Sequence, residues 1–181
     1  MHVTPRSVLA VGLVLCTAAL ALAASASAIR SSGSAIDPGT NINGMLVVQG
    51  IAREADASLF GTFCDPVVVR AGRRTRSCGQ LPPLKRIFVG YGIFAPEEQI
   101  DSAWNKLSWR LWIDGQSVSL SRFGNSDRRL LGFAPAGYRD VVLREWAVIL
   151  AGAQGRHSIR YRTRLPQGVI DTTWRFTVAR A

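Results

Sequence analysis

"LSWRLWIDGQSVSL" (residues 107–120) holds the strongest turn signal in the chain. The pair Asp114-Gly115 stands between residues that alternate apolar and polar, which is typical of a two-residue β-hairpin loop. Pairing across this loop places Leu111 opposite Val118, with Trp109 on the same apolar face. Trp112 falls on the other face, among serines. The stretch therefore predicts a hairpin with one buried face, and it leaves Trp112 as the tryptophan available to a ligand.

The chain after Gly44 repeats this pattern of short β-rich runs separated by turn signals. Ile159 and Tyr161 alternate with arginines, as expected of a strand with one face on a core and the other in water. Residues 85–95 are apolar on both sides of the alternation, which predicts a central strand. Gly90 and Gly92 within it favour a bulge or a close approach by another element. Besides the hairpin, the expected strands are residues 44–52, 59–63, 66–71, 85–95, 139–150, 157–165 and 172–179.

One helix is expected, over residues 96–106. Pro96 suits the first helical position, and the two glutamates that follow favour the positive end of the helix dipole. Ile100 and Trp104 belong to an apolar stripe at helical spacing, so the helix should cover a sheet or close one end of it. The sequence as a whole predicts an all-β fold, an antiparallel two-sheet sandwich with this one short helix.

Two short motifs point to a family of such sandwiches. The pattern Gly-x-His-x-Ile-x-Tyr at residues 155–161 resembles the penultimate strand of many bacterial immunoglobulin-like modules. The helix followed by "WRLWIDGQSV" (109–118) is similar to a pattern in exported bacterial proteins of uncharacterised function. The resemblance implies an immunoglobulin-like architecture and carries no activity, because fold does not fix function. The spacing of Cys64 and Cys78 departs from the inter-sheet disulfide of antibody domains.

Residues 1–28 have the composition of a secretory signal peptide. Arg6 supplies a positive start, residues 8–24 an apolar run, and residues 26–28 ("ASA") a small-residue site for cleavage after Ala28. The apolar run is close to the lower limit for a membrane span, so a retained anchor is the alternative to cleavage. After cleavage no membrane span is expected. Residues 29–43 then form a flexible leader, and residues 44–181 one domain in the cell envelope or outside the cell.

Cys64 and Cys78 are the cysteines that remain after cleavage. In an exported chain an isolated pair is best explained as one disulfide, with two free thiols as the alternative. The bond would close a loop of about 15 residues and stabilise the fold by roughly 3 kcal/mol. No metal is expected, because this spacing offers too few ligands. No cofactor is expected either, because the sequence has no phosphate-binding loop.

The chain is strongly basic. Removal of residues 1–28 removes Arg6 from 22 Lys and Arg residues and none of the 12 acidic ones, which leaves a net charge of +9. Such a field attracts anionic polymers, although a bias of 20 arginines to 2 lysines also arises from codon composition. The candidate binding residues are an arginine stripe on the predicted strands, a basic tip at residues 72–76, and one aromatic ring: Arg160, Arg162, Arg164, Arg175, Arg73, Arg74, Arg76 and Trp112.

No motif predicts catalysis. His157 is the one histidine after the leader, and Ser158 beside it would point to the opposite face of a strand, so no Ser-His-Asp arrangement forms. Glu97, Glu98 and Asp101 lie close in sequence, but solvation and the helix dipole already account for them. No catalytic residue is therefore assigned.

The sequence predicts a non-enzymatic binding or accessory module, with an anionic polymer or another envelope protein as the partner. Nucleic acid is not the expected polymer. Two alternatives stay open: an exported carbohydrate-active enzyme whose carboxylates meet only in three dimensions, and an assembly domain without a ligand.

Overall fold

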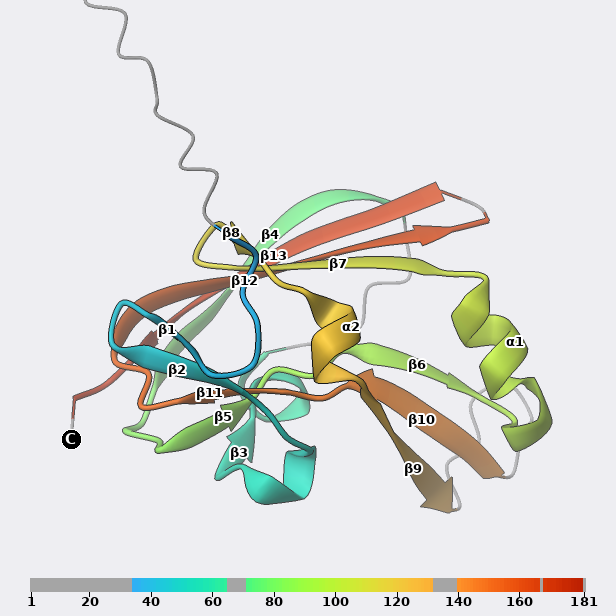
Figure 1. The fold of residues 1–181 in the computed structure, drawn as a ribbon, viewed down its shortest axis with the longest axis horizontal. Helices are drawn as coiled ribbons and strands as arrows, with labels where there is room; N and C mark the ends of the chain where they lie inside the picture. Colours follow the sequence, from blue (N-terminus) through green and yellow to red (C-terminus); the bar gives the residue numbers. More distant parts are fainter. Residues whose placement is uncertain (1–33, 65–70, 132–139, 167, 181) are drawn as a thin grey trace, which may run out of the picture. The chain divides into compact units, whose positions relative to one another are not determined.

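Strands make up most of the computed structural model, which describes residues 34–64, 71–131, 140–166 and 168–180. They form three sheets (Figure 1). The largest, here called the β12 sheet, runs in the order β4 (Gly72–Leu81), β13 (Gly168–Val178), β12 (Gly155–Leu165), β7 (Ser108–Ile113) and β8 (Gln116–Ser117). The second runs β1 (Thr40–Ile42), β2 (Met45–Gln49), β11 (Val148–Ala151), β5 (Arg86–Phe88) and β3 (Ala57–Ser58). The third runs β6 (Gly92–Ala95), β10 (Asp140–Trp146) and β9 (Asn125–Leu131).

The helical segments are short. They are η1 (Ala52–Glu54), η2 (Leu59–Phe63), η3 (Glu97–Gln99), α1 (Ile100–Asn105) and α2 (Leu120–Phe123). The expected helix over residues 96–106 is confirmed as η3 followed by α1, and it buries Ile100 and Trp104 as the apolar stripe predicts.

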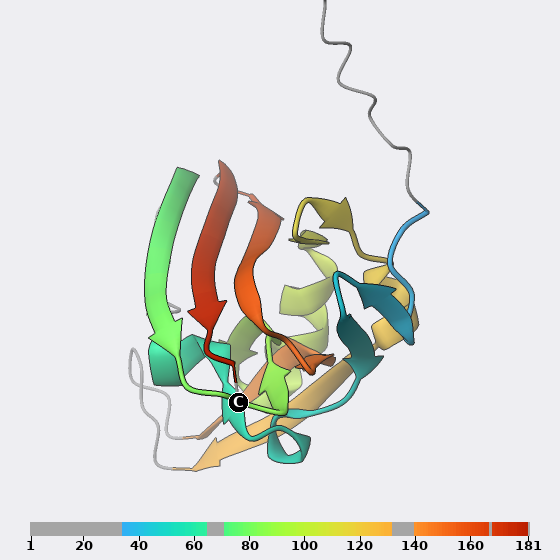
Figure 2. The ribbon, with the colours of Figure 1, turned by 90° about the vertical axis from the view of Figure 1, so that its left-hand side faces the viewer.

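The predicted all-β sandwich is confirmed, with one layer divided in two. In Figure 1 the β12 sheet lies above the two smaller sheets, and Figure 2 shows β4, β13 and β12 side by side. β10 and β11 follow each other with only Ala147 between them, and each pairs with its own neighbours. The second and third sheets together form the layer opposite the β12 sheet, and the consecutive strands β10 and β11 connect them. The pairings of β4 with β13 and of β3 with β5 are parallel, which the antiparallel expectation did not include.

Glycines permit this division. The expected central strand at residues 85–95 is two strands, β5 and β6, separated at residues 89–91. A Cβ atom on Gly92 would collide with the backbone carbonyl of Arg144 on the neighbouring β10. One on Gly90 would collide with the backbone carbonyl of Trp146 on β10, and with the ring of Phe88. The close approach predicted from these glycines is therefore present at both.

The hairpin that decided the fold is confirmed. Trp112 pairs with Ser117 and Ile113 with Gln116. Asp114 and Gly115 have φ values of 48° and 82°, as a type I′ turn requires. The ladder ends at Ser117, because the chain then enters α2 at Leu120. Within the described ranges, no strand pairs with the first residues of β7 on that side.

The core lies between the layers. Its largest fully buried side chains include Trp174, Tyr161, Phe88 and Phe123. Leu111 and Ile113 of the hairpin join it, at 1% and 0% exposure, which agrees with the predicted buried face.

Two expected segments differ in the structure. Residues 59–63 form the turn η2 instead of a strand, because Gly61 has a φ of 86° and the N–H of Cys64 donates back to the carbonyl of Leu59 at 3.0 Å. Residues 72–76 were expected to form a basic tip. They instead begin the ten-residue strand β4, because their backbone groups form ladder hydrogen bonds with β13.

The leader also differs in its described part. Ile36 is fully buried and bridges Val118, and β1 pairs with β2, so these residues belong to the sandwich. The side chains of Ile36 and Ile42 are buried in the core, and this burial attaches the segment to the sandwich. The signal segment 1–28 and most of the expected strand 66–71 lie outside the described residues.

Candidate functional site

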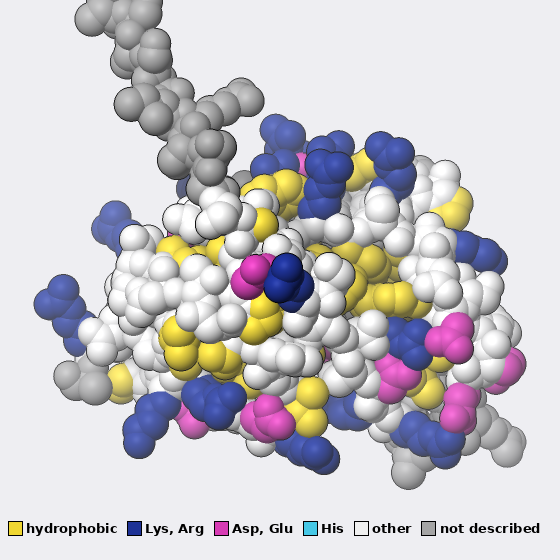
Figure 3. Space-filling view, viewed as in Figure 1, with side chains coloured by type: hydrophobic (Ala, Val, Ile, Leu, Met, Phe, Trp, Pro, Cys, Tyr) yellow, Lys and Arg dark blue, Asp and Glu magenta, His cyan; other side chains and the backbone are white. Residues whose placement is uncertain are grey.

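The outer face of the β12 sheet gathers most of the predicted arginines. Residues that pair directly across a ladder project on the same face of a sheet. Arg162 pairs with Arg110 on one side and with Asp171 on the other, and Asp171 pairs in turn with Arg73. Arg160, Arg164 and Arg175 follow at alternate positions. We call this surface the arginine face; it consists of Arg73, Arg110, Arg160, Arg162, Arg164 and Arg175, with Asp171 and Trp112. In Figure 3 basic side chains stand along the upper margin, over this sheet.

One buried carboxylate lies at the centre of the arginine face. Arg160 donates to both oxygens of Asp171, at 2.7 Å from Nε and 2.6 Å from Nη2. Arg73 Nε lies 3.5 Å from Asp171 Oδ2. The hydrogen bond from Arg160 is the main cause of a lowered Asp171 pKa, so this carboxylate is charged at neutral pH. Arg160 is thus already neutralised by the protein.

Trp112 supports the same arginine. The guanidinium carbon of Arg160 lies 4.7 Å from the centre of the Trp112 ring, a cation–π contact. Trp112 is half-buried, and Arg160 covers one face of it. The ring that the sequence left for a ligand therefore helps to hold Arg160.

Four other cations of the arginine face make no ion pair within 4.0 Å among the described residues: Arg110, Arg162, Arg164 and Arg175. Arg162 lies opposite Asp171 and adds to the positive field that, after the hydrogen bond from Arg160, lowers the pKa of that carboxylate. Arg110 and Arg162 lie directly opposite each other on neighbouring strands, an arrangement of like charges that costs free energy. An anion bound between them would remove that repulsion.

Arg74 and Arg76 are not part of this surface. They pair with Thr172 and Trp174, which project into the core, so they lie on the inner side of β4. Of the predicted binding residues, the structure brings together the other five arginines and Trp112. It adds Arg110, whose place depends on the β7–β12 register, a non-local pairing that no local pattern encodes.

A cleft lined by three tryptophans adjoins the arginine face. Trp104 of α1, Trp109 of β7 and Trp146 of β10 meet there, and the cleft has a volume of about 440 Å³. Trp104 stacks on Trp109 with ring centroids 5.1 Å apart, and Trp146 packs against Trp104 at the same distance. In Figure 3 it is the hollow of hydrophobic side chains below the basic margin. We call it the tryptophan cleft. Trp109 lies on the apolar face of the hairpin as predicted, but it is only half-buried, because that face opens into the cleft here.

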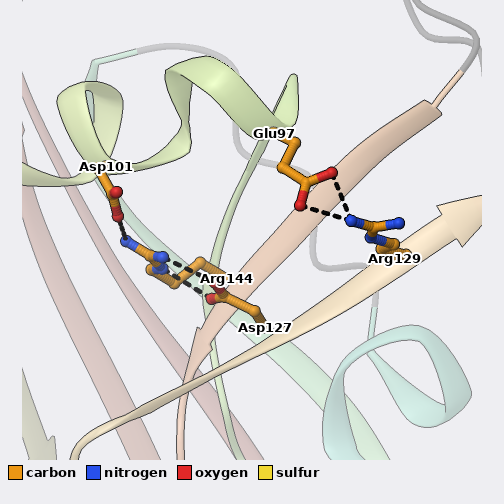
Figure 4. Close-up of polar contacts among 5 residues, drawn as sticks. All are labelled: Glu97, Asp101, Asp127, Arg129 and Arg144. Carbon is orange, nitrogen blue, oxygen red and sulfur yellow. Dashed lines mark hydrogen bonds and ion pairs between the residues drawn. The ribbon is translucent and has the colours of Figure 1, made fainter.

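Ion pairs fix the helix that carries Trp104 (Figure 4). Arg144 of β10 donates to Asp127 of β9 at 2.7 and 2.6 Å and to Asp101 of α1 at 2.6 Å. Arg129 of β9 reaches Glu97 at 2.6 Å. Glu97 and Asp101, which the sequence left as weak candidates for acid catalysis, therefore attach the helix to the third sheet.

His157 anchors the hairpin turn. Its Nδ1 lies 2.8 Å from Asp114 Oδ2 and its Nε2 lies 3.0 Å from the carbonyl oxygen of Gln154. The backbone N–H of Ser158 donates to the other oxygen of Asp114 at 2.7 Å. Both ring nitrogens thus face acceptors, which favours the imidazolium form. The hydrogen bond with Asp114 raises the pKa of His157 above its ordinary value, although burial acts in the opposite direction.

The stability of the fold should therefore depend on pH through His157. A pKa raised in the folded state gives stabilisation that is complete below the unfolded value, about 6.5, and is lost as pH rises through the folded value. We expect urea unfolding to show lower stability at pH 9 than at pH 6. His157→Gln should remove this difference and cost about 1–3 kcal/mol at pH 6, because the positive charge beside Asp114 is lost and a single amide NH2 replaces two separate ring N–H donors. An unchanged pH difference in the variant would contradict this role.

Two further observations concern the described part of the chain. Within it, no three or more His, Cys, Asp and Glu side chains gather so that they could hold a metal ion. None of its helices has the length and apolar character needed to cross a membrane.

Comparisons with known proteins identify no family. No protein-family model and no curated protein matches the chain. Among solved structures, a cysteine protease inhibitor of Entamoeba histolytica is 10% identical, with a TM-score of 0.29 over 59% of this chain and 96% of its own. The solution structure of Amebosin is also 10% identical, with a TM-score of 0.25 over 60% of this chain and 99% of its own. These scores define neither a fold family nor a function, and the immunoglobulin-like resemblance stays a prediction.

Proposed function

We propose that this protein is a secreted or cell-envelope β-sandwich module that binds an anionic polymer through the arginine face. The observation that carries the proposal is a group of four arginines on one outer sheet face that make no ion pair within 4.0 Å in the described part of the chain: Arg110, Arg162, Arg164 and Arg175.

The geometry of a sheet suits a repeating ligand. Alternate residues along a strand lie about 6.6–6.8 Å apart and neighbouring strands about 4.8 Å apart. Arg162 and Arg164 therefore follow the strand direction, while Arg110 extends the positive surface across it. A guanidinium group binds carboxylate, sulfate or phosphate through two parallel hydrogen bonds. A chain with an anionic group on successive units can contact several of them at once.

The proposed compartment has two supports. The sequence of residues 1–28 predicts export, and Cys64 and Cys78 are joined in a disulfide, with Cα atoms 4.9 Å apart. Disulfides persist mainly in oxidising compartments, such as the periplasm or the exterior of the cell. An envelope protein with an acidic surface is the alternative partner.

The test is retention on heparin, a sulfated polysaccharide. Because Arg160 is bound to Asp171, the informative variant is Arg162→Ser/Arg164→Ser/Arg175→Ser. Each lost exposed charge should cost about 0.5–1 kcal/mol, so affinity should fall roughly 10- to 100-fold. The slope of log Kd against log salt should become shallower, because fewer counterions are released on binding.

The matched control removes the same charge elsewhere. Arg53→Ser/Lys85→Ser/Arg180→Ser takes three exposed cations from outside the arginine face. We expect it to retain most of the affinity. Equal losses in the two triple variants would mean that net charge alone drives binding, and the arginine face would be discarded as a site.

A further inference from the structure

We propose that the anionic polymer is an acidic polysaccharide, and that the tryptophan cleft holds one of its sugar rings. This inference rests on the proposed function and makes it more specific. The arginine face would bind the acidic groups, and the cleft would bind the ring of a neighbouring unit.

Arg110 joins the two surfaces. It pairs with Arg162 on the arginine face, and it is also one of the residues that line the tryptophan cleft. Arg110 lies at the border of both because, among the described residues, β8 pairs only with Trp112 and Ile113, so that the first residues of β7 form a sheet edge there. A polymer that leaves the arginine face over this edge passes Arg110 and arrives directly at the tryptophans.

The lining of the cleft fits a sugar ring. A pyranose has an apolar face of C–H groups, which packs on an aromatic ring, and hydroxyl groups around its edge. The tryptophans, Leu107 and Val118 supply the apolar surface, while Asn105 and Ser121 supply groups that can donate to hydroxyls and accept from them. A volume of about 440 Å³ lies within the usual range for small-ligand sites. A bare polyphosphate has no apolar group to place there.

The aromatic rings are held in place before a ligand arrives. Trp104 is only 8% exposed and packs against both Trp109 and Trp146, with ring centroids 5.1 Å apart in each pair. The pairs from Arg144 to Asp101 and Asp127 fix the helix behind Trp104. A sugar would therefore meet a surface that needs little ordering, which lowers the entropic cost of binding.

The experiment fills the cleft without touching the arginine face. Asn105 is exposed and lines the cleft, so Asn105→Trp should block it. Ser102 is exposed on the same helix and is not part of the lining, so Ser102→Trp is the matched control. Kd values are measured by calorimetry for a heparin oligosaccharide, for polyphosphate and for single-stranded DNA. In Asn105→Trp a sugar ring can no longer stack in the cleft, so the Kd for heparin should rise about tenfold. The Kd for polyphosphate should not change. Ser102→Trp should bind all three ligands as the wild type does.

The outcomes separate the two proposals. If Asn105→Trp binds heparin as tightly as the wild type, the cleft is not a sugar site, while the arginine face stands as long as its own variant loses affinity. If the wild type binds neither heparin nor polyphosphate, both proposals fail. Tighter binding of DNA than of heparin, lost in Asn105→Trp, would assign the cleft to a nucleobase and overturn the polysaccharide.

A second measurement does not depend on the folding of Asn105→Trp. In Trp112→Phe, which lacks the indole of the arginine face, tryptophan fluorescence should shift on addition of the heparin oligosaccharide and not on addition of polyphosphate, because only the former reaches the indoles of the cleft. Identical responses to the two polymers would overturn the inference.

Discussion

Gly92→Ala should lower the free energy of unfolding by about 3 kcal/mol or more, since overpacking at a site that cannot relax is costly. The added Cβ would meet the backbone carbonyl of Arg144 and the Cα of Glu145 on the paired strand β10. Backbone held in a ladder cannot move aside as the end of a flexible side chain can. Urea unfolding monitored by circular dichroism measures the effect.

Gly115→Ala is the informative comparison. Gly115 has a φ of 82° and nothing within 4 Å of an added Cβ, so the substitution brings backbone strain without a collision. We expect it to cost only about 1 kcal/mol. If Gly92→Ala were no more harmful than Gly115→Ala, β6 and β10 would have to lie further apart than the structure places them.

The second large effect concerns the disulfide. Replacing Cys64 and Cys78 together by serine should lower the free energy of unfolding by about 3 kcal/mol, because the unfolded chain regains the freedom of a loop of about 15 residues. Cys64 is 7% exposed and packs in the core, while Cys78 belongs to β4. The bond thus ties the edge strand of the β12 sheet to the turn η2.

Reduction provides the control for this variant. Wild-type protein in excess reductant should unfold at the same urea concentration as the double serine variant, and reductant should not affect the variant itself. Intact-mass analysis of exported protein that showed two free thiols would contradict the assignment of the bond.

Local patterns predicted those parts of the fold that depend on neighbouring residues. The Asp114-Gly115 turn and its register follow from the φ values that only such residues adopt readily. The alternation of Ile159 and Tyr161 with arginines correctly separated the buried face of β12 from the arginine face. The expected helix was found because Ile100 and Trp104 recur at helical spacing.

Non-local pairings were beyond the reach of these patterns. The parallel contact of β4 with β13 brings Arg73 beside Asp171 from almost 100 residues away, and no periodicity within either strand encodes it. The position of Trp146 in the cleft could not be predicted for a similar reason. The β-rich run 139–150 divides at Ala147, where the backbone carbonyl of Trp146 lies close to Gly90 and the N–H of Ala147 donates to the carbonyl of Gly124. Both glycines are far away in sequence. The arginines were therefore predictable as a stripe, and the tryptophan cleft was not predictable as a site.

The central position of β12 has a kinetic consequence. Hydrogen bonds to β13 on one side and β7 on the other hold its backbone in place, so Arg162 and Arg164 occupy the same positions before and after an encounter. Association with the proposed polymer would then need no folding step and would be limited by diffusion, accelerated by the positive field at low ionic strength. Added salt would lower the association rate constant. The dissociation rate constant would instead depend on how many guanidinium contacts must break at the same time.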